Sequence, residues 1–255
     1  MNNDMKNTPI KEDERIDDLQ IKNYHIIQKK KGFCFGIDAV LLSDYAKIKK
    51  NSRGMDLCSG TGIVPLLMEA KYPLDFVEGL EYQEAYAEMA ERSVRMNSLE
   101  NKIKIVQGDV KKVKENYERE IFDWVTCNPP YMTGNHGLAN QDYGKAIARH
   151  EITCTLKDVV EAAAFLLKPY GHFVMVHRPF RIAEIIYTLK KHQLEPKRIR
   201  FVHPYVSKEP NMVLIDAAKW GNQRITVDPP LIVYEEDGSY TDEIYEIYGE
   251  MKKKR

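Results

Sequence analysis

The sequence contains no long hydrophobic run. Its longest nearly apolar stretch, Val159 to Leu167, is interrupted by Glu161, whereas an α-helix that crosses a bilayer needs about 20 apolar residues. The first fifteen residues, MNNDMKNTPIKEDER, are polar and lack the apolar core of a secretory signal. We therefore expect a soluble, cytoplasmic chain that makes no contact with a membrane.

The sequence also lacks an excess of charge and any pairing of its cysteines. Lys plus Arg number 38 and Asp plus Glu number 38, so the formal net charge is zero. A domain dedicated to nucleic acid commonly has a pI above ~9, so any contact with nucleic acid must rest on a local basic patch. The four cysteines, at positions 34, 58, 127 and 154, form no Cys-x-x-Cys pair and no zinc spacing with histidine. We expect reduced thiols, no bound metal and a monomer.

Short apolar runs alternate with longer helical patterns along the chain, which is typical of βα units around a parallel sheet. The patterns predict strands at 54–57, 75–80, 103–107, 122–127 and 172–177, and helices at 62–71, 83–97, 110–117, 156–167 and 180–192. Two more strands, 195–202 and 212–219, are joined by a short loop with proline and predict an antiparallel hairpin. We expect a mobile polar tail at 1–14, one domain at 15–250 with an N-terminal segment at 15–53, and a basic tail at 251–255.

The most informative loop follows the first of these strands and reads Asp56-Leu57-Cys58-Ser59-Gly60-Thr61-Gly62. Glycines allow left-handed turns and a close approach of a ligand to the backbone. The following helix start supplies free N–H groups. Pro65 stands where a dinucleotide loop has its third glycine, and no Lys-Ser or Lys-Thr follows as in a Walker loop. A carboxylate before the glycines suits a cationic amine, such as the amino end of S-adenosylmethionine (SAM).

Two acids at the ends of the next strands extend this site. Glu81 lies about 20 residues beyond the glycines, where an acid typically accepts hydrogen bonds from a ribose. Asp109 ends the third strand and suits an adenine amine, although such an acid is also a common helix cap. Tyr82 and Val110 follow these acids, and we assign both to the same cofactor site. Together they predict an adenosine-shaped site at the carboxyl edge of the sheet.

The tetrapeptide Asn128-Pro129-Pro130-Tyr131 follows the fourth strand and predicts the chemistry. An exocyclic amine conjugated to a ring is a poor nucleophile, because its lone pair is delocalised. The Asn128 side-chain oxygen and the Pro129 carbonyl can both accept from such an NH₂ and localise its lone pair. The prolines fix the backbone, so the acceptors are preorganised, and Tyr131 offers a face on which a base can stack.

These motifs, with the order of the strands, resemble the Rossmann-like class I SAM methyltransferases, which have a mostly parallel seven-stranded α/β sheet and a C-terminal antiparallel hairpin. Three further segments resemble the bacterial tRNA1(Val) adenine-N6-methyltransferase family: 33–42 (FCFGIDAVLL), 149–151 (RHE) and 229–234 (PPLIVY). The resemblance runs from about Arg15 to Tyr248. It implies SAM as cofactor, bound in part by Phe35, Gly36 and Asp38, and a tRNA substrate methylated at the adenine 3′ of the anticodon of a valine tRNA. Cys58 replaces the first glycine of the family's cofactor loop.

Contacts with RNA are less clearly marked. Lys29, Lys30 and Lys31 precede the FCFGIDAVLL segment and are candidates for phosphate contacts, although charge runs are usually solvated faces. The pair Arg149 and His150 is a candidate lining of the target pocket, or a cluster at a helix end. His150 is not required as a base, since the proton can leave after methyl transfer.

Other activities remain open at this point. The same tetrapeptide serves glutamine-N5 methylation of proteins. Enzymes of that kind combine a helical domain with the catalytic one, and the 55 residues that precede Asp56 are too few for such a domain and the 33–42 segment. N6-methylation of adenine in ribosomal RNA or DNA is a further alternative. A protein that binds SAM or tRNA without catalysis is the non-enzymatic one, and the retention of Asn128, Asp56 and Glu81 argues against it.

Overall fold

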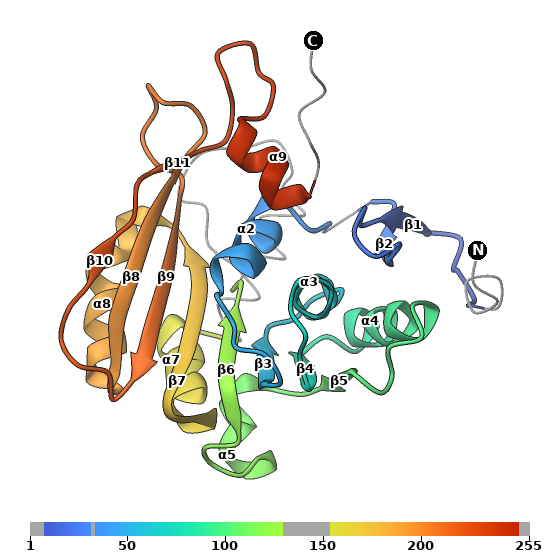
Figure 1. Ribbon diagram of the computed structural model, residues 1–255. Helices are drawn as coiled ribbons and strands as arrows, with labels where there is room; N and C mark the ends of the chain where they lie inside the picture. Colours follow the sequence, from blue (N-terminus) through green and yellow to red (C-terminus); the bar gives the residue numbers. More distant parts are fainter. Residues whose placement is uncertain (1–7, 32–33, 130–153, 250–255) are drawn as a thin grey trace.

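A twisted, mostly parallel sheet forms the centre of the protein, which we describe from a computed structural model over residues 8–31, 34–129 and 154–249 (Figure 1). The strands follow the order β10-β8-β9-β7-β6-β3-β4-β5, and β11 pairs with β8. Their bounds are β3 Arg53–Leu57, β4 Phe76–Glu81, β5 Ile103–Gln107, β6 Phe122–Cys127, β7 Leu167–His177, β8 Leu194–His203, β9 Met212–Lys219, β10 Thr226–Val227 and β11 Leu231–Ile232.

The helices cover both faces of this sheet, as Figure 1 shows. The described helices are α2 Ile37–Tyr45, α3 Ile63–Lys71, α4 Glu84–Met96, α5 Val113–Asn116, α7 Leu156–Leu166, α8 Ile182–Lys191 and α9 Asp242–Tyr248, with 3₁₀ turns η1 Val110–Lys112 and η2 Pro179–Arg181. One apolar cluster lies beneath α2, α3, α4 and α9, and a second lies beneath α7 and α8. Because both faces of the sheet are covered, most residues of the inner strands β3, β4, β6 and β9 are buried.

The predicted mostly parallel sheet is confirmed, and the nine strands that the described residues contribute to it include the seven that were predicted. β3 pairs in parallel with both β4 and β6. Strands β4 and β5 are added on one side of β3 and β6 and β7 on the other, so the strand order reverses at β3. Open α/β sheets bind ligands outside the carboxyl ends of the strands at such a switch point. β9 runs antiparallel between β7 and β8, as the predicted hairpin requires, and β10 and β11 add two residues each at its edge.

An N-terminal hairpin, β1 (Glu14–Asp18) and β2 (His25–Lys29), packs against α4 outside the main sheet. Glu14, the last residue of the predicted N-terminal tail, is the first residue of β1 and is buried. Its carboxylate accepts two hydrogen bonds of 2.7 Å from the Arg92 guanidinium on α4. A bidentate pair of this kind fixes the hairpin to the helix with defined geometry.

No helix in the part of the chain that the structure describes combines the length and apolar character needed to span a bilayer.

Candidate functional site

The loop after β3 has the left-handed turns that its glycines predict. Gly60 and Gly62 have φ values of 56° and 81°, and Gly62 forms the N-cap of α3. Cys58, at the position of the family's first glycine, also has a positive φ, 60°. Left-handed backbone costs an L-residue roughly 1–2 kcal/mol, which explains why glycine suits this position.

Glu81 joins this loop to the end of β4. One carboxylate oxygen accepts from the Gly60 N–H at 2.8 Å and the other from the Gln83 N–H at 2.8 Å. The side chain therefore holds the glycine turn at the carboxyl edge of the sheet. An ionised carboxylate has about four acceptor sites, so these two contacts leave acceptor capacity for hydroxyl groups of a ligand.

Asp56 lies within the sheet beneath the loop and is 1% exposed. The Thr126 hydroxyl on β6 donates to its carboxylate at 2.7 Å, because Asp56 and Thr126 are paired in the parallel register of β3 and β6. Burial raises the pKa of Asp56 to about 7, although the bond from Thr126 favours the ionised form. Sequence reasoning missed Thr126, which only the strand register places beside Asp56.

The remaining predicted cofactor residues of this edge lie at the ends of β4 and β5. Asp109 caps the turn η1 by accepting from the Lys111 N–H at 2.9 Å, so the capping role that the sequence left open is present. Val110, the next residue, is buried, whereas Tyr82 is 53% exposed. An exposed tyrosine directly after Glu81 offers a flat face at the rim of this site.

The strand register brings Asn128 next to the cofactor loop. Leu57 of β3 pairs with Cys127 of β6, so Cys58 and Asn128 are the residues that follow this pair. Asn128 is partly exposed, while Pro129 is buried. The other predicted residues of the catalytic and target pocket, Pro130, Tyr131, Arg149 and His150, lie outside the described residues.

Three cysteine thiols, those of Cys58, Cys127 and Cys154, lie near one another at the cofactor loop. The Cys58 and Cys154 sulfur atoms are 3.9 Å apart, and contact between the thiols of Cys58 and Cys127 raises the pKa of Cys58. Burial likewise raises the pKa of the Cys127 thiol. A raised thiol pKa lowers the fraction of reactive thiolate, so these cysteines pack as neutral groups. In the part of the chain that the structure describes, no group of three or more His, Cys, Asp or Glu side chains could hold a metal ion.

The segment before α2 contributes the N-terminal part of the predicted site. The Phe35 N–H donates to the Gln28 side-chain oxygen at 2.9 Å, which links the segment to the hairpin. Gly36 is the N-cap of α2, and the Asp38 carboxylate accepts from the Ala39 N–H at 3.0 Å. A Cβ on Gly36 would come within 2.9 Å of the Asp38 carboxylate, so glycine leaves room for that side chain. Gln28 is a second residue that sequence reasoning missed, because nothing in its neighbourhood indicates a bond across seven residues.

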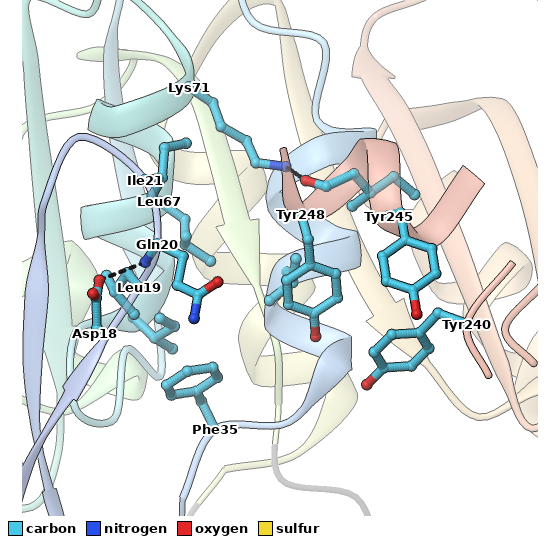
Figure 2. Close-up of a pocket in the computed structure, with 13 residues that line it drawn as sticks. Asp18, Leu19, Gln20, Ile21, Phe35, Leu67, Lys71, Tyr240, Tyr245 and Tyr248 are labelled. Atoms are coloured by element: carbon cyan, nitrogen blue, oxygen red, sulfur yellow. Dashed lines mark hydrogen bonds between the residues drawn. The ribbon is translucent and has the colours of Figure 1, made fainter. Parts of the chain in front are cut away.

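Phe35 also lines a pocket of about 230 Å³ between the hairpin turn, α3 and α9 (Figure 2). Figure 2 shows Tyr240, Tyr245 and Tyr248 on one side and Asp18 to Ile21 on the other. The Lys71 amine at its rim donates to the Ile247 carbonyl at 3.0 Å. Among the described residues that we predicted to bind cofactor, Phe35 alone lines this pocket, so the pocket adjoins the site from its N-terminal side.

Two of the three predicted RNA-contacting lysines already have partners in the hairpin or in the residues just before it. The Lys29 amine bonds to Asp13 at 2.7 Å and lies 3.6 Å from the buried Glu14 carboxylate. The Lys30 amine donates to the Glu12 carbonyl at 2.9 Å. Lys31 is exposed. Lys29 therefore has a structural role whether or not RNA contacts it.

Comparison with known proteins agrees with this geometry. The model of the family described as Methyltransferase small domain matches residues 36–195. Two relatives are named tRNA1(Val) (adenine(37)-N6)-methyltransferase. The one from Aeromonas hydrophila is 23% identical over 87% of this chain and 91% of its own length. The one from Porphyromonas gingivalis is 25% identical over 89% and 91%. The fold is similar to the crystal structure of a predicted O-methyltransferase from Agrobacterium tumefaciens, with a TM-score of 0.68 and 23% identity over 83% of this chain and 95% of that one.

Proposed function

This chain belongs to the Methyltransferase small domain family, and from that premise we propose that it methylates N6 of an adenine in tRNA. The observation that carries the proposal is the pairing of Leu57 with Cys127. It makes Asn128, the first residue of the Asn-Pro-Pro-Tyr tetrapeptide, a neighbour of the loop that holds the methyl donor.

The methyl donor is SAM, and its sulfonium supplies an electrophilic methyl group. The described residues fit this cofactor. The Thr61 hydroxyl is buried in the loop without a hydrogen-bond partner among them, and buried polar groups normally have one. Glu81 retains acceptor capacity at the end of β4, and Asp56 places a titratable carboxyl beneath the glycine turn. We assign the ribose hydroxyls to Glu81 and the methionyl amine to the neighbourhood of Asp56.

Asn128 and Pro129 act on the substrate amine in this proposal. Their oxygens accept hydrogen bonds from the exocyclic NH₂ and draw its lone pair out of the ring. Interactions that strengthen as positive charge develops on that nitrogen lower the activation barrier. They therefore raise kcat and change substrate binding little. The proton leaves the nitrogen after transfer and does not need a dedicated base. We propose that Tyr131 stacks on the base and that Arg149 and His150 line the pocket.

The choice of tRNA rests on the two relatives, which are aligned over 87% and 89% of this chain and 91% of their own lengths. Their shared name supports adenine 37, the base 3′ of the anticodon, in a valine tRNA. Bases of an anticodon loop are single-stranded and can be splayed into an active site without opening a duplex.

The test is a labelled-SAM assay on four separate substrates: tRNA, ribosomal RNA, DNA and peptide-release factor. We expect transfer to tRNA, with N6-methyladenine at position 37 of a valine tRNA transcript. Asn128→Ala should lower kcat by about 10²–10³-fold, by analogy with removal of one preorganised hydrogen-bonding group, and leave SAM affinity nearly unchanged. Transfer to release factor alone would replace the proposal with glutamine methylation. A wild-type rate in Asn128→Ala would remove its chemical basis.

A further inference from the structure

Phe180 is an unusually exposed aromatic residue at the edge of the sheet where the proposed chemistry takes place. It lies in η2, directly after β7, and 71% of its surface is accessible. Single exposed apolar residues are common on protein surfaces, so exposure alone says little. Its position relative to Asn128 gives it meaning.

The register of β6 and β7 fixes that position. Cys127 of β6 pairs in parallel with Met175 of β7, and both strands then continue toward the same edge. Asn128 and Pro129 follow Cys127, while β7 runs two residues beyond Met175 to His177. Phe180 therefore lies at the carboxyl edge, in the turn that follows the strand next to the one before the tetrapeptide.

The backbone around Phe180 is held in place. Pro179 restricts the backbone at the first position of η2. The Arg178 guanidinium donates to the Asn211 carbonyl at 2.9 Å, which connects η2 to the turn between β8 and β9. Arg181 bonds to Glu184 on α8 at 2.7 Å. A ring presented on a fixed turn loses little conformational freedom when a flat partner binds.

We propose that Phe180 is a stacking platform for an unpaired base of the RNA substrate, next to the adenine presented to Asn128. The inference rests on the proposed function and adds a contact on the β7 side of the site. Aromatic faces bind single-stranded bases without demanding a sequence. The platform would thus hold a nucleotide beside the target while the exocyclic amine is positioned.

The chain offers a matched control on the same strand. Tyr170 is 72% exposed, but it lies near the start of β7, where the strand pairs with the beginning of β6 at Phe122. It is an equally exposed ring at the opposite edge of the sheet. We would compare Phe180→Ala, Phe180→Leu, Phe180→Trp and Tyr170→Ala in three measurements: affinity for the valine tRNA transcript, steady-state methylation, and SAM affinity.

Phe180→Ala should weaken RNA affinity and raise KM for RNA by roughly 5- to 150-fold, the range for loss of one base–aromatic stack. SAM affinity and thermal midpoint should stay unchanged. Phe180→Trp should retain RNA affinity, and its fluorescence should be quenched when RNA binds. Phe180→Leu should resemble alanine, and Tyr170→Ala should resemble the wild type.

Three results would overturn the inference while leaving the proposed function intact. They are tRNA methylation by Phe180→Ala at wild-type KM, wild-type RNA affinity in Phe180→Leu, or a loss of RNA affinity in Tyr170→Ala equal to that in Phe180→Ala. If the wild-type chain bound tRNA but methylated only another substrate, the proposed function would fail and the affinity comparison would still decide on Phe180. Absence of RNA binding by the wild-type chain would overturn both.

Discussion

Asp56 shows how a single carboxyl group links the fold to pH. Its pKa of about 7 in the folded protein lies above the ordinary value of 3.8, so the folded state holds the proton more tightly than the unfolded state. Between about pH 4 and pH 7 the unfolded chain therefore binds fewer protons, and the free energy of unfolding falls as pH rises. In the wild type the free energy of unfolding should fall by a few kcal/mol across this window, and we predict that Asp56→Asn abolishes this fall.

Denaturant titrations without SAM at pH 5, 6, 7 and 8 would measure this difference. Thr126→Val provides the companion variant, because loss of its hydroxyl should raise the pKa of Asp56 further and shift the decline to higher pH. Identical pH profiles for the wild type and Asp56→Asn would mean that Asp56 is ionised throughout.

Cys58 offers a second test at the scale of one residue. The φ of 60° at this position favours glycine, although glycine gains more freedom in the unfolded chain. Cys58→Ala and Cys58→Gly both remove the thiol and differ only in Cβ. We expect the glycine variant to be more stable than the alanine variant by about 1 kcal/mol, and both to bind SAM within a few-fold of wild type. Greater stability of the alanine variant in chemical denaturation would contradict the left-handed backbone.

The residues of the site were predictable where they follow a strand in a motif, and missed where only the register joins them. Asp56, Gly60 and Glu81 are identified by their order and spacing. Thr126 and Gln28 carry no such signal, because their contacts cross 70 and 7 residues of sequence. Lys29 was assigned to RNA from its charge, and its bond to Asp13 depends on the hairpin pairing.

At the scale of elements, the βα units were predicted to within two residues, except that β7 begins five residues earlier than predicted. The β1–β2 hairpin, α2, α9 and the short strands β10 and β11 were not predicted. α2 has six buried residues among its nine, so it lacks the polar face that marks an amphipathic helix. The turn of the β1–β2 hairpin places Gln20, Lys22 and Asn23 in left-handed backbone without glycine or proline. α9 is only seven residues long, too short for a helical period to stand out.

The hairpin depends on the ion pair between Glu14 and Arg92, whose side chains are 0% and 3% exposed. Removing one partner of a buried pair costs about 3–5 kcal/mol when the other charge is left alone, but Arg92 keeps a second acidic partner, Glu88, at 2.7 Å. We therefore predict a smaller loss in Glu14→Gln, about 1.5–3 kcal/mol by denaturant unfolding. The Arg92 guanidinium lowers the pKa of Glu14 to about 2, so the stabilisation is present above about pH 4.5 and is lost as pH falls toward 2.

Glu91→Gln is the control for this prediction, because Glu91 pairs with Arg95 on the same helix and both side chains are about half exposed. Exposed pairs contribute about 0–1 kcal/mol. Equal losses in the two variants would show that burial of the Glu14 pair adds nothing to the attachment of the hairpin.

At the scale of the whole molecule, a net charge of zero limits how RNA can be held. Several cations are neutralised within the fold: Lys29, a predicted RNA contact, by Asp13, Arg198 by Asp228 at 2.7 Å, and Arg200 by Glu243 at 2.7 Å. These three side chains are therefore less available to replace counterions on the phosphates. Shape and stacking, rather than the overall field, must supply much of the affinity.

The dependence of tRNA affinity on salt should therefore be shallow. With about three to five phosphates neutralised, the slope of log K against log salt should lie near −2 to −4, from roughly −0.7 to −0.9 per contact.

Replacing Lys30 and Lys31 together by alanine should reduce the magnitude of this slope by about 1–2 if they touch phosphates. Unlike a Lys29 variant, this double variant leaves the surroundings of the buried Glu14 carboxylate unchanged. Lys114→Ala, which removes an exposed partner of Glu161 on the α7 side, is the matched control and should leave the slope unchanged. Filter binding of a valine tRNA transcript from 50 to 300 mM salt measures these slopes. A slope steeper than about −6 in the wild type would mean that a long-range basic surface dominates binding, and an unchanged slope in the double variant would move the phosphate contacts away from the hairpin.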